Sequence, residues 1–463
     1  MEEYDLVVIG SGAGLNLVDA AVNTGMKVAL AENGPMGGTC LNRGCIPSKM
    51  WIYPADIIRQ IEDGVHVGVN ASLESADFET VRRRTWGAVL RERDHIFEAI
   101  KQDPRATLLQ DTVRFIGDKT LQASDRTLRA PKIVIAGGAR SAIPNIPGLD
   151  DVNYHTSETI FDITRLPQSM MIIGGGYKAC EFGHFFSAFG TKVTILQRNV
   201  RLLPREELEM GDVVMRRLGK HVTIRTAYDV QEVRKSDGNV QVIGRDRQTM
   251  APMRDEAELL LIGAGMKSNA DWLDPTVTGV QLDERGYVVV NEHLETTAPG
   301  IWALGDITGR HMFRHTANYE SRIVWYNLSA QNKAIIDEHA IPHAVYTYPT
   351  IGSVGMSENE VKKSGRKYLV GLSSYANVAK GEAMANNDGL VKVLVEAGTK
   401  RILGAHIVGP EADLLVQQLV YLMNAGDESY LPLARSQIIH PSLNEAVAGA
   451  FARLTSPEEH HTH

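Results

Sequence analysis

The sequence is poor in cysteine, in net positive charge and in long apolar runs. Its three cysteines among 463 residues are too few for a framework of stabilising disulfides. The formal net charge of −8 argues against a nucleic-acid partner, because phosphate backbones favour basic surfaces. No stretch approaches the ~20 apolar residues that cross a bilayer, and the acidic start of the chain lacks the features of a secretory signal. We therefore expect a cytoplasmic protein with neither a membrane nor a nucleic-acid partner.

The hydrophobic and charged content and the length of the sequence indicate a folded chain of several domains. Hydrophobic residues make up 43% of the sequence and charged residues 22%, which excludes intrinsic disorder. At ~100–200 residues per domain, the length implies about three or four domains. A strand–glycine turn–helix–strand pattern begins at Leu6 and recurs at Ser169. The distance along the sequence between these two copies is too long for a solenoid repeat and fits two separate dinucleotide-binding domains.

The first glycine turn follows an apolar strand and precedes a helix. In Gly10-x-Gly12, glycine lets backbone N–H groups and the helix N-terminus approach a pyrophosphate. Glu32 stands about 20 residues later, where a carboxylate accepts hydrogen bonds from a ribose hydroxyl. The usual third glycine is replaced by Leu15, with Gly14 one place earlier. The alternative is an ordinary strand-to-helix turn, but the position of Glu32 favours a nucleotide site.

The second turn, Gly174-x-Gly176-x-x-Ala, matches the pattern better. Gln197, rather than an acid, ends its second strand. Three arginines follow it: Arg198, Arg201 and Arg205. Arginines can pair with a 2′-phosphate, which an acid would repel, so the pattern favours NADPH over NADH. The alternative is that these arginines belong to a solvated loop.

Two of the three cysteines, Cys40 and Cys45, lie five positions apart. In an ideal helix their Cα atoms would be ~8.6 Å apart, whereas a disulfide needs less than ~7 Å. The backbone must therefore bend if they are to be bridged, and Gly44, with Pro47 just beyond, supplies that freedom. A zinc site would need further paired ligands, and two inert buried cysteines are the other alternative. We interpret the pair as redox-active and expect no metal site, with the histidines at 460, 461 and 463 in a solvated tail.

His440 and Glu445 form a second candidate constellation near the C-terminus. A histidine can deliver the proton that a thiolate leaving group requires, and a carboxylate on its other ring nitrogen fixes its orientation. Taken alone, the pair is typical of the start of a surface helix. Together with a redox dithiol, it favours a catalytic dyad.

The segment from Gly37 to Lys49 closely resembles the active-site segment of the FAD-dependent pyridine nucleotide–disulfide oxidoreductases, which include mycothione reductase, dihydrolipoyl dehydrogenase and glutathione reductase. The two glycine turns, the segment Ala303 to Asp306 and the C-terminal His-Pro…Glu extend the resemblance over nearly the whole chain. It implies an α/β fold with two Rossmann-like dinucleotide-binding domains and an α+β C-terminal dimerisation domain. The implied ranges are 1–150 for FAD, 151–272 for NAD(P)H, 273–342 for a central segment completing the FAD site, and 343–463 for the interface.

The resemblance also implies roles for single residues. Cys45 would donate to the flavin and Cys40 would exchange with substrate, while Lys49 pairs with Glu181 beside the flavin. The implied FAD-binding residues are Gly10, Gly12, Gly14, Glu32, Gly38, Thr39, Gly138, Asp306 and Ala317. The implied NAD(P)H-binding residues are Gly174, Gly176, Tyr177, Arg198, Arg205 and Gly265. His440 and Glu445 would serve the opposite subunit of a homodimer.

The expected activity is electron transfer from NADPH through FAD and a Cys40–Cys45 disulfide to a low-molecular-weight disulfide of the mycothione or glutathione type. One alternative is dihydrolipoyl dehydrogenase, which would oxidise dihydrolipoamide with NAD. Another is a docking subunit without catalysis. Two residues depart from the family pattern: Lys178 stands at a usually apolar position beside the nicotinamide, and Met266 stands where an arginine usually contacts the nucleotide. We assign Lys178 no role beyond an extra positive charge for cofactor or substrate.

Overall fold

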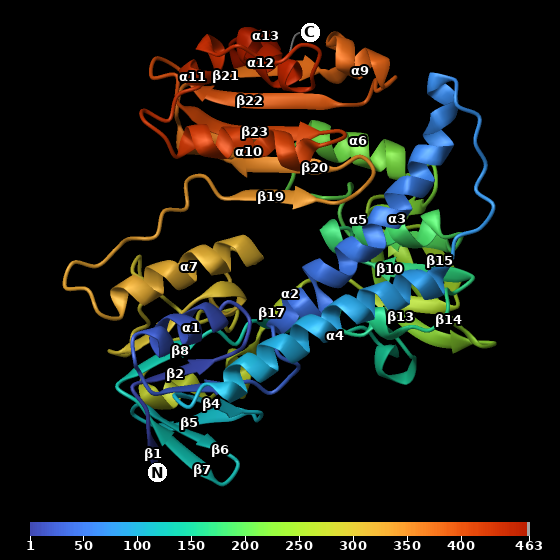
Figure 1. Ribbon diagram of the computed structural model, residues 1–463. Helices are drawn as coiled ribbons and strands as arrows, with labels where there is room; N and C mark the ends of the chain where they lie inside the picture. Colours follow the sequence, from blue (N-terminus) through green and yellow to red (C-terminus); the bar gives the residue numbers. More distant parts are fainter. Residues whose placement is uncertain (461–463) are drawn as a thin grey trace.

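A five-stranded parallel sheet carries the first glycine turn (Figure 1). The computed structural model describes residues 1–460, so His461 and His463 lie outside the described residues. The strand order is β18-β8-β2-β3-β4. The strands are β2 (Leu6–Ile9), β3 (Val28–Ala31), β4 (Ala106–Leu109), β8 (Lys132–Ile135) and β18 (Ile301–Ala303). β2 and β3 are apolar and buried at every position, as expected for parallel strands covered on both faces.

Alternate residues of β2 face two different cores. Leu6 and Val8 pack against the helices α1 (Leu15–Asn23) and α7 (Arg314–Asn327). Val7 and Ile9 belong to the core beneath a smaller sheet with the order β1-β7-β6-β5. Its strands are β1 (Glu2–Glu3), β5 (Val113–Gly117), β6 (Thr120–Ala123) and β7 (Arg126–Arg129).

A second parallel sheet, with the order β12-β11-β10-β16, carries the other glycine turn. Its strands are β10 (Ser169–Ile173), β11 (Lys192–Leu196), β12 (Thr223–Arg225) and β16 (Leu259–Ile262), with the helices α5 (Tyr177–Ala188) and α6 (Leu208–Leu218). The antiparallel strands β13 (Tyr228–Ser236), β14 (Asn239–Asp246) and β15 (Pro252–Ala257) pack beside it. The pairing of β9 (Ala139–Ser141) with β17 (Met266–Ser268) joins the two units, and β18 then returns the chain to the first sheet.

The C-terminal unit is an antiparallel sheet with the order β19-β20-β23-β22-β21 (Figure 1, orange to red). Its strands are β19 (Pro342–Val345), β20 (Ile351–Gly355), β21 (Tyr368–Ser374), β22 (Leu390–Glu396) and β23 (Ile402–Val408). Its helices are α8 (Glu358–Ser364), α9 (Ala379–Ala383), α10 (Ala412–Met423), α11 (Leu431–Arg435), α12 (Asn444–Ala452) and α13 (Pro457–His460). Together the three units confirm the predicted α/β fold class.

Two long helices, α3 (Cys45–Asp63) and α4 (Phe78–Gln102), lie side by side between the first unit and the second (Figure 1, blue). The short helix α2 (Gly38–Arg43) leads into α3. The ring of Trp51 of α3 packs edge-on against Phe161 and at a tilt against Phe185 of α5, with ring centroids 4.9 Å and 4.6 Å apart. This aromatic core fixes α3 against α5.

The sequence suggested one helical region from residue 48 to about residue 100, and the structure divides it. α3 passes into a short 3₁₀ turn, Gly64–Val67, which ends at Gly68 in the left-handed region at φ +84°. An extended stretch follows until Asp77, whose side chain accepts a hydrogen bond from the backbone N–H of Thr80 and caps α4. Glycine and a capping aspartate therefore interrupt the helix.

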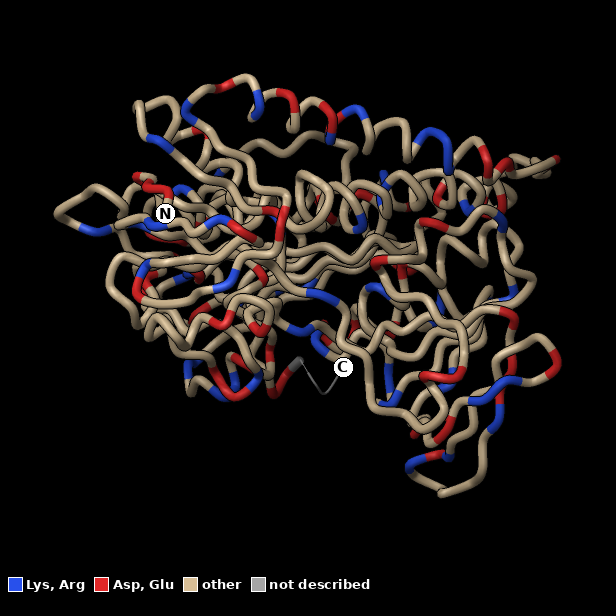
Figure 2. The backbone as a smooth tube through the Cα atoms, turned by 90° about the horizontal axis from the view of Figure 1, so that it is seen from below, with Lys and Arg blue, Asp and Glu red and all other residues tan. Residues whose placement is uncertain are grey.

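The surface of the described chain mixes charges of both signs. Figure 2 shows Lys and Arg interspersed with Asp and Glu along the backbone. Within residues 1–460, no helix is both long enough and apolar enough to cross a bilayer.

Candidate active site

A cavity of about 490 Å³ lies where β2, the junction of α2 and α3, and the start of α5 converge. The predicted site residues that line it are Gly10, Gly12, Glu32, Gly38, Thr39, Cys40, Cys45, Lys49, Gly138, Tyr177, Glu181, Asp306 and Ala317. The predicted residues that do not line it are Gly14, Gly174, Gly176, Arg198, Arg205, Gly265, His440 and Glu445. The residues implied for FAD, except Gly14, therefore share one cavity with the cysteine centre, while most of the implied NAD(P)H ligands lie outside it.

One end of the cavity is a cradle of bare backbone. Gly10 has φ +102°, and a Cβ there would lie 2.3 Å from the carbonyl oxygen of Ala136. Gly38 has φ +68°, and its Cβ would lie 2.7 Å from the Cα of Gly12. A Cβ on Gly12 would instead meet only Arg314, whose Nη1 is 3.8 Å away. These glycines leave room for a pyrophosphate beside backbone N–H groups, so this end of the cavity fits FAD.

Gly14 explains the unusual glycine spacing of the first turn. A Cβ on Gly14 would lie 2.3 Å from the carbonyl oxygen of Gly10 and 2.8 Å from Cγ1 of Val8. Gly14 therefore permits close packing of α1 on β2, which is the task of the third glycine in the usual motif. The shift from position 15 to position 14 changes no cavity wall, because neither Gly14 nor Leu15 lines the cavity.

Glu32 is fixed in orientation at the end of β3. Its Oε2 accepts hydrogen bonds from the backbone N–H and the hydroxyl of Ser11, at 2.8 Å and 2.6 Å. Its Oε1 accepts a third bond from the N–H of Gly34, at 2.8 Å. The carboxylate thus lines the cavity in one defined position, as a ribose-binding acid requires.

The chain bends between the two cysteines, as the sequence predicts. α2 ends at Arg43, Gly44 has φ −134° and ψ −119°, and α3 begins at Cys45. A Cβ on Gly44 would lie 2.8 Å from the carbonyl oxygen of Thr39 and 3.1 Å from the Cα of Cys40. Glycine is therefore needed for the approach of α3 to α2, and both cysteines, present as free thiols, line the cavity.

The two thiols have different proton affinities. A hydrogen bond from Cys40, together with the charge of Lys49, lowers the pKa of Cys45 to about 7. The same hydrogen bond and burial raise the pKa of Cys40. Cys45 is therefore the thiolate of the pair near neutral pH, with Cys40 as its hydrogen-bond donor.

Lys49 and Glu181 form an ion pair across the two helices. Lys49 lies one helical turn after Cys45 on α3, and its Nζ is 2.8 Å from Oε2 of Glu181 on α5. Oε1 of Glu181 accepts a hydrogen bond from the backbone N–H of Tyr346, at 3.0 Å, and the Lys49 ammonium lies 4.4 Å from the centre of the Tyr346 ring. The buried carboxylate thus joins α3, α5 and the C-terminal unit at one point.

The remaining wall near the cysteines is formed by Tyr177, Lys178 and Asp306. Tyr177 and Lys178 begin α5, and Asp306 lies in the 3₁₀ turn Gly305–Thr308. Burial raises the pKa of Asp306 to about 6. The Lys178 ammonium donates to Ser157 Oγ at 2.9 Å and contacts Met266 Sδ at 3.0 Å. Both positions at which the sequence departs from the family pattern therefore meet in the cavity wall.

The second glycine turn also leaves free space beside its backbone. Gly174 has φ +124°, and a Cβ there would lie 2.4 Å from the carbonyl oxygen of Gly263, whereas nothing lies near a Cβ on Gly176. Gln197 is buried, and its Nε2 donates to the carbonyl oxygen of Arg201 at 3.1 Å, which shapes the loop after β11. The side chains of Arg198 and Arg205 are exposed beside this turn. Gly265, at φ +137°, lies outside the cavity.

The three loop arginines are available for an anion. In the part of the chain that the structure describes, Arg198, Arg201 and Arg205 form no ion pair. Directly after them, Glu206 accepts hydrogen bonds from Nε2 of His343 at 2.8 Å and from the hydroxyl of Ser353 at 3.1 Å. The loop is therefore anchored at its end to β19 and β20.

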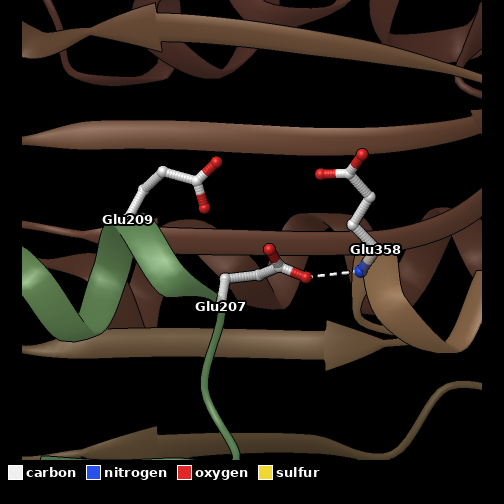
Figure 3. Close-up of side chains that lie close together, drawn as sticks. All are labelled: Glu207, Glu209 and Glu358. Carbon is white, nitrogen blue, oxygen red and sulfur yellow. Dashed lines mark hydrogen bonds between the residues drawn. The ribbon is translucent and has the colours of Figure 1, made fainter. Parts of the chain in front are cut away.

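A cluster of three carboxylates extends this anchor (Figure 3). Oxygens of Glu207, Glu209 and Glu358 lie within 4.8 Å of one another, a spacing that would suit a cation. Lys392 of β22 supplies that cation, because its buried Nζ is 2.8 Å from an oxygen of each glutamate. The cluster is an internal ion network that joins the start of α6 to the C-terminal sheet.

His440 and Glu445 form the predicted pair away from the cavity of their own chain. Nδ1 of His440 is 2.9 Å from Oε1 of Glu445, and Oε2 accepts a hydrogen bond from the N–H of Ser442 at 3.0 Å. The hydrogen bond to His440 lowers the pKa of Glu445. The imidazole side chain is 71% exposed, so its Nε2 side is accessible from outside the chain.

Sequence reasoning missed Arg314 and Glu320 of α7. Arg314 lines the cavity beside the Gly12 cradle, and no local motif marks it. Oε2 of Glu320 accepts a hydrogen bond from the N–H of Gly305 at 2.5 Å, and its fully buried Oε1 has no partner among the described residues. In the sequence, only Ala317, on the same helix, indicated that α7 contributes to the cavity wall.

Known proteins resemble this chain over nearly its whole length. Residues 4–321 match the family model of the pyridine nucleotide-disulphide oxidoreductases, and residues 341–451 match the model of the dimerisation domain of that family. Mycothione reductase of Mycobacterium tuberculosis is 34% identical, covering 98% of this chain and 100% of that protein. Dihydrolipoyl dehydrogenase of Chlorobaculum parvum is 31% identical, covering 98% of each chain. The solved structure of RclA from Escherichia coli, an HOCl-induced flavoprotein disulfide reductase, aligns with a TM-score of 0.87 and 29% identity over 98% of this chain and 99% of RclA.

Proposed function

The chain belongs to the pyridine nucleotide–disulphide oxidoreductases, and we propose that it reduces a low-molecular-weight disulfide of the mycothione or glutathione type with NADPH. As a member it is an FAD-dependent NAD(P)H:disulfide oxidoreductase that carries the dimerisation domain of the family. The observation that carries the proposal is the placement of Cys40 and Cys45 in the cavity, with Lys49 and Glu181 paired beside them.

The glycine cradle, Glu32 and Asp306 would hold FAD, whose chemistry would be the transfer of an electron pair from the nucleotide to the Cys40–Cys45 disulfide. Cys45 then remains as a thiolate, because Lys49 favours its charged form. Cys40 passes its proton to the imidazole of His440, and its sulfur attacks one sulfur of the substrate, which forms a mixed disulfide and expels the first thiolate. Cys45 finally attacks the sulfur of Cys40, expels the second thiolate, which takes a proton from water, and restores the Cys40–Cys45 disulfide.

His440 supplies the proton for the first departing thiol. Glu445 holds Nδ1 of the imidazole, so Nε2 is the atom that exchanges the proton. The exposure of His440 and its absence from the cavity of its own chain support action in the cavity of the second subunit of a homodimer.

The preference for NADPH is supported by the loop after β11. Arg198, Arg201 and Arg205 carry charges that no acid of residues 1–460 pairs, and Gln197 stands where an acid would repel a 2′-phosphate. We place the reaction in the cytoplasm, where thiols are kept reduced.

The disulfide substrate is supported by the end-to-end similarity to mycothione reductase. A docking subunit without catalysis would not need the ion pair Lys49–Glu181, the lowered pKa of Cys45 and the dyad His440–Glu445 together.

A panel assay tests the proposal. Purified protein should contain FAD and should reduce mycothione or glutathione disulfide with NADPH faster than it oxidises dihydrolipoamide with NAD. Cys45→Ser should abolish turnover, whereas Cys180→Ser, at the buried third cysteine, should leave it unchanged. Faster turnover with dihydrolipoamide and NAD, or full activity of Cys45→Ser, would contradict the proposal.

A further inference from the structure

Lys178 is a second lysine at the reaction end of the cavity. It stands three residues before Glu181 on α5, so both side chains lie on the same face of that helix, and both line the cavity. Glu181 is already paired with Lys49 at 2.8 Å. Lys178 therefore adds a positive charge that the Lys49–Glu181 pair does not use.

The ammonium of Lys178 is incompletely satisfied. A lysine offers three donors, and this one meets a single oxygen, Ser157 Oγ at 2.9 Å, and a thioether sulfur, Met266 Sδ at 3.0 Å. A thioether is a weak acceptor, so one good hydrogen bond is made where three are available. Within residues 1–460 no carboxylate lies within 4.0 Å of the Lys178 ammonium.

Acids surround the ammonium without pairing with it. Glu158, Asp306 and Glu181 interact with its charge through space. Glu158 is held elsewhere, because it accepts hydrogen bonds from the hydroxyl of Thr156 and from the N–H of Ser141. Burial lowers the pKa of Lys178, because reduced hydration disfavours the charged form.

The partners of Lys178 indicate which molecule satisfies it. Ser157, Met266 and Asp306 line the same cavity as the Gly12 cradle, so a cofactor that extends from the cradle to Cys45 passes this wall. Cys40, the proposed nucleophile toward the substrate, is not a hydrogen-bond partner of Lys178 among the described residues. A carbonyl oxygen of a cofactor in this part of the cavity would give the ammonium the oxygen acceptor that it lacks.

We propose that Lys178 donates a hydrogen bond to bound FAD and stabilises the negative charge that FAD gains on reduction. This inference rests on the proposed function, because it requires FAD in the cavity. A cation beside a group that becomes more negative favours the reduced state, so Lys178 makes FAD a stronger electron acceptor from the nucleotide.

The test measures FAD alone. A Cys40→Ser/Cys45→Ser parent removes the redox disulfide, so that FAD is the sole redox centre, and the equilibrium between bound FAD and a reference dye is followed by absorbance. Adding Lys178→Met should lower the equilibrium constant for FAD reduction about tenfold, which is about 30 mV for a two-electron couple. Lys178→Arg, which keeps the charge, should restore most of the loss. Lys192→Met, at an exposed lysine of β11, should match the parent.

The outcomes separate this inference from the function on which it rests. An equilibrium constant unchanged by Lys178→Met overturns the inference, even if the KM for NADPH rises, because the ammonium then serves the nucleotide rather than FAD. A parent without FAD overturns the proposed function as well. If Lys178→Met does not fold, Lys178→Gln replaces it, with the same expected loss and the same result overturning the inference.

Discussion

Nδ1 of His440 lies 2.9 Å from Oε1 of Glu445, and the pair projects away from the cavity of its own chain. If His440 is the proton donor to the departing thiol, His440→Gln should lower kcat by about 10²–10⁴, the usual contribution of a general acid. The reduction of FAD by NADPH, followed in a stopped-flow experiment, should keep its rate, because it does not involve this histidine.

A mixed dimer tests which subunit His440 serves. Chains with Cys45→Ser and chains with His440→Gln are each inactive as homodimers, but together they form one site in which both groups are intact if His440 acts on the other subunit. Co-expression and purification through two different tags should therefore restore turnover. An inactive mixed dimer would show that His440 acts within its own chain.

The pKa of Cys45, about 7, predicts selective alkylation of the reduced protein. Because the thiolate is the nucleophile, the rate of iodoacetamide labelling at Cys45 should rise with pH and reach half its maximum near pH 7. Lys49→Met removes the cation beside it and should move this midpoint to higher pH. Cys180, whose pKa burial raises, is the internal control and should stay unlabelled throughout.

Glu320 predicts a loss of stability as the pH rises from about 4.5 through about 7. Burial raises its pKa from 4.5 to about 7, so the folded state favours the protonated form. Its stabilising effect is complete below pH 4.5 and is lost as the pH rises through 7. At 1.36 kcal/mol for each pH unit, the wild-type protein should lose up to about 3 kcal/mol between pH 4.5 and pH 8.5 relative to Glu320→Gln. Urea unfolding of both proteins at the two pH values measures this difference, and parallel pH profiles would contradict it.

Lys392→Met should be strongly destabilising. It leaves three carboxylates around an apolar side chain, and removing one partner of a buried ion network typically costs about 3–5 kcal/mol. Because the network anchors the loop of Arg198 to Arg205, the KM for NADPH should rise as well. A second change, Glu207→Gln in the Lys392→Met protein, should recover part of the unfolding free energy. Urea unfolding and steady-state kinetics of the three proteins check both effects.

Arg198→Ala tests the nucleotide preference. Loss of a charge-assisted hydrogen bond to a 2′-phosphate should raise the KM for NADPH about tenfold and leave the KM for NADH nearly unchanged. Arg165→Ala removes an exposed arginine that pairs with Glu258 and should alter neither value. Equal effects of Arg198→Ala on the two nucleotides would remove the argument for NADPH.

Local features of the site could be predicted from the sequence, and long-range ones could not. The bend at Gly44 and the two glycine turns depend only on neighbouring residues. The spacing of the glycines and their conformational freedom were therefore sufficient to predict them. The partners of Lys178 come from two distant segments, the loop of Ser157 and the strand β17 of Met266, which only the fold brings together. Lys392 meets glutamates up to 185 positions away, and no sequence motif links them to it. The split of the helical region after α3 was not predicted, although Gly64, Gly68 and the capping residue Asp77 are local features that mark it.

The bend at Gly44 also limits how the redox centre can be transplanted. Cys40 belongs to α2 and Cys45 to α3, so the unit that works is a pair of helices with a glycine junction rather than a string of six residues. Grafted onto one continuous helix, the same string would hold the Cα atoms ~8.6 Å apart, beyond the reach of a disulfide. A protein engineer who wants this electron-transfer element must therefore copy the junction together with the close contact of Gly44 with Thr39 and Cys40.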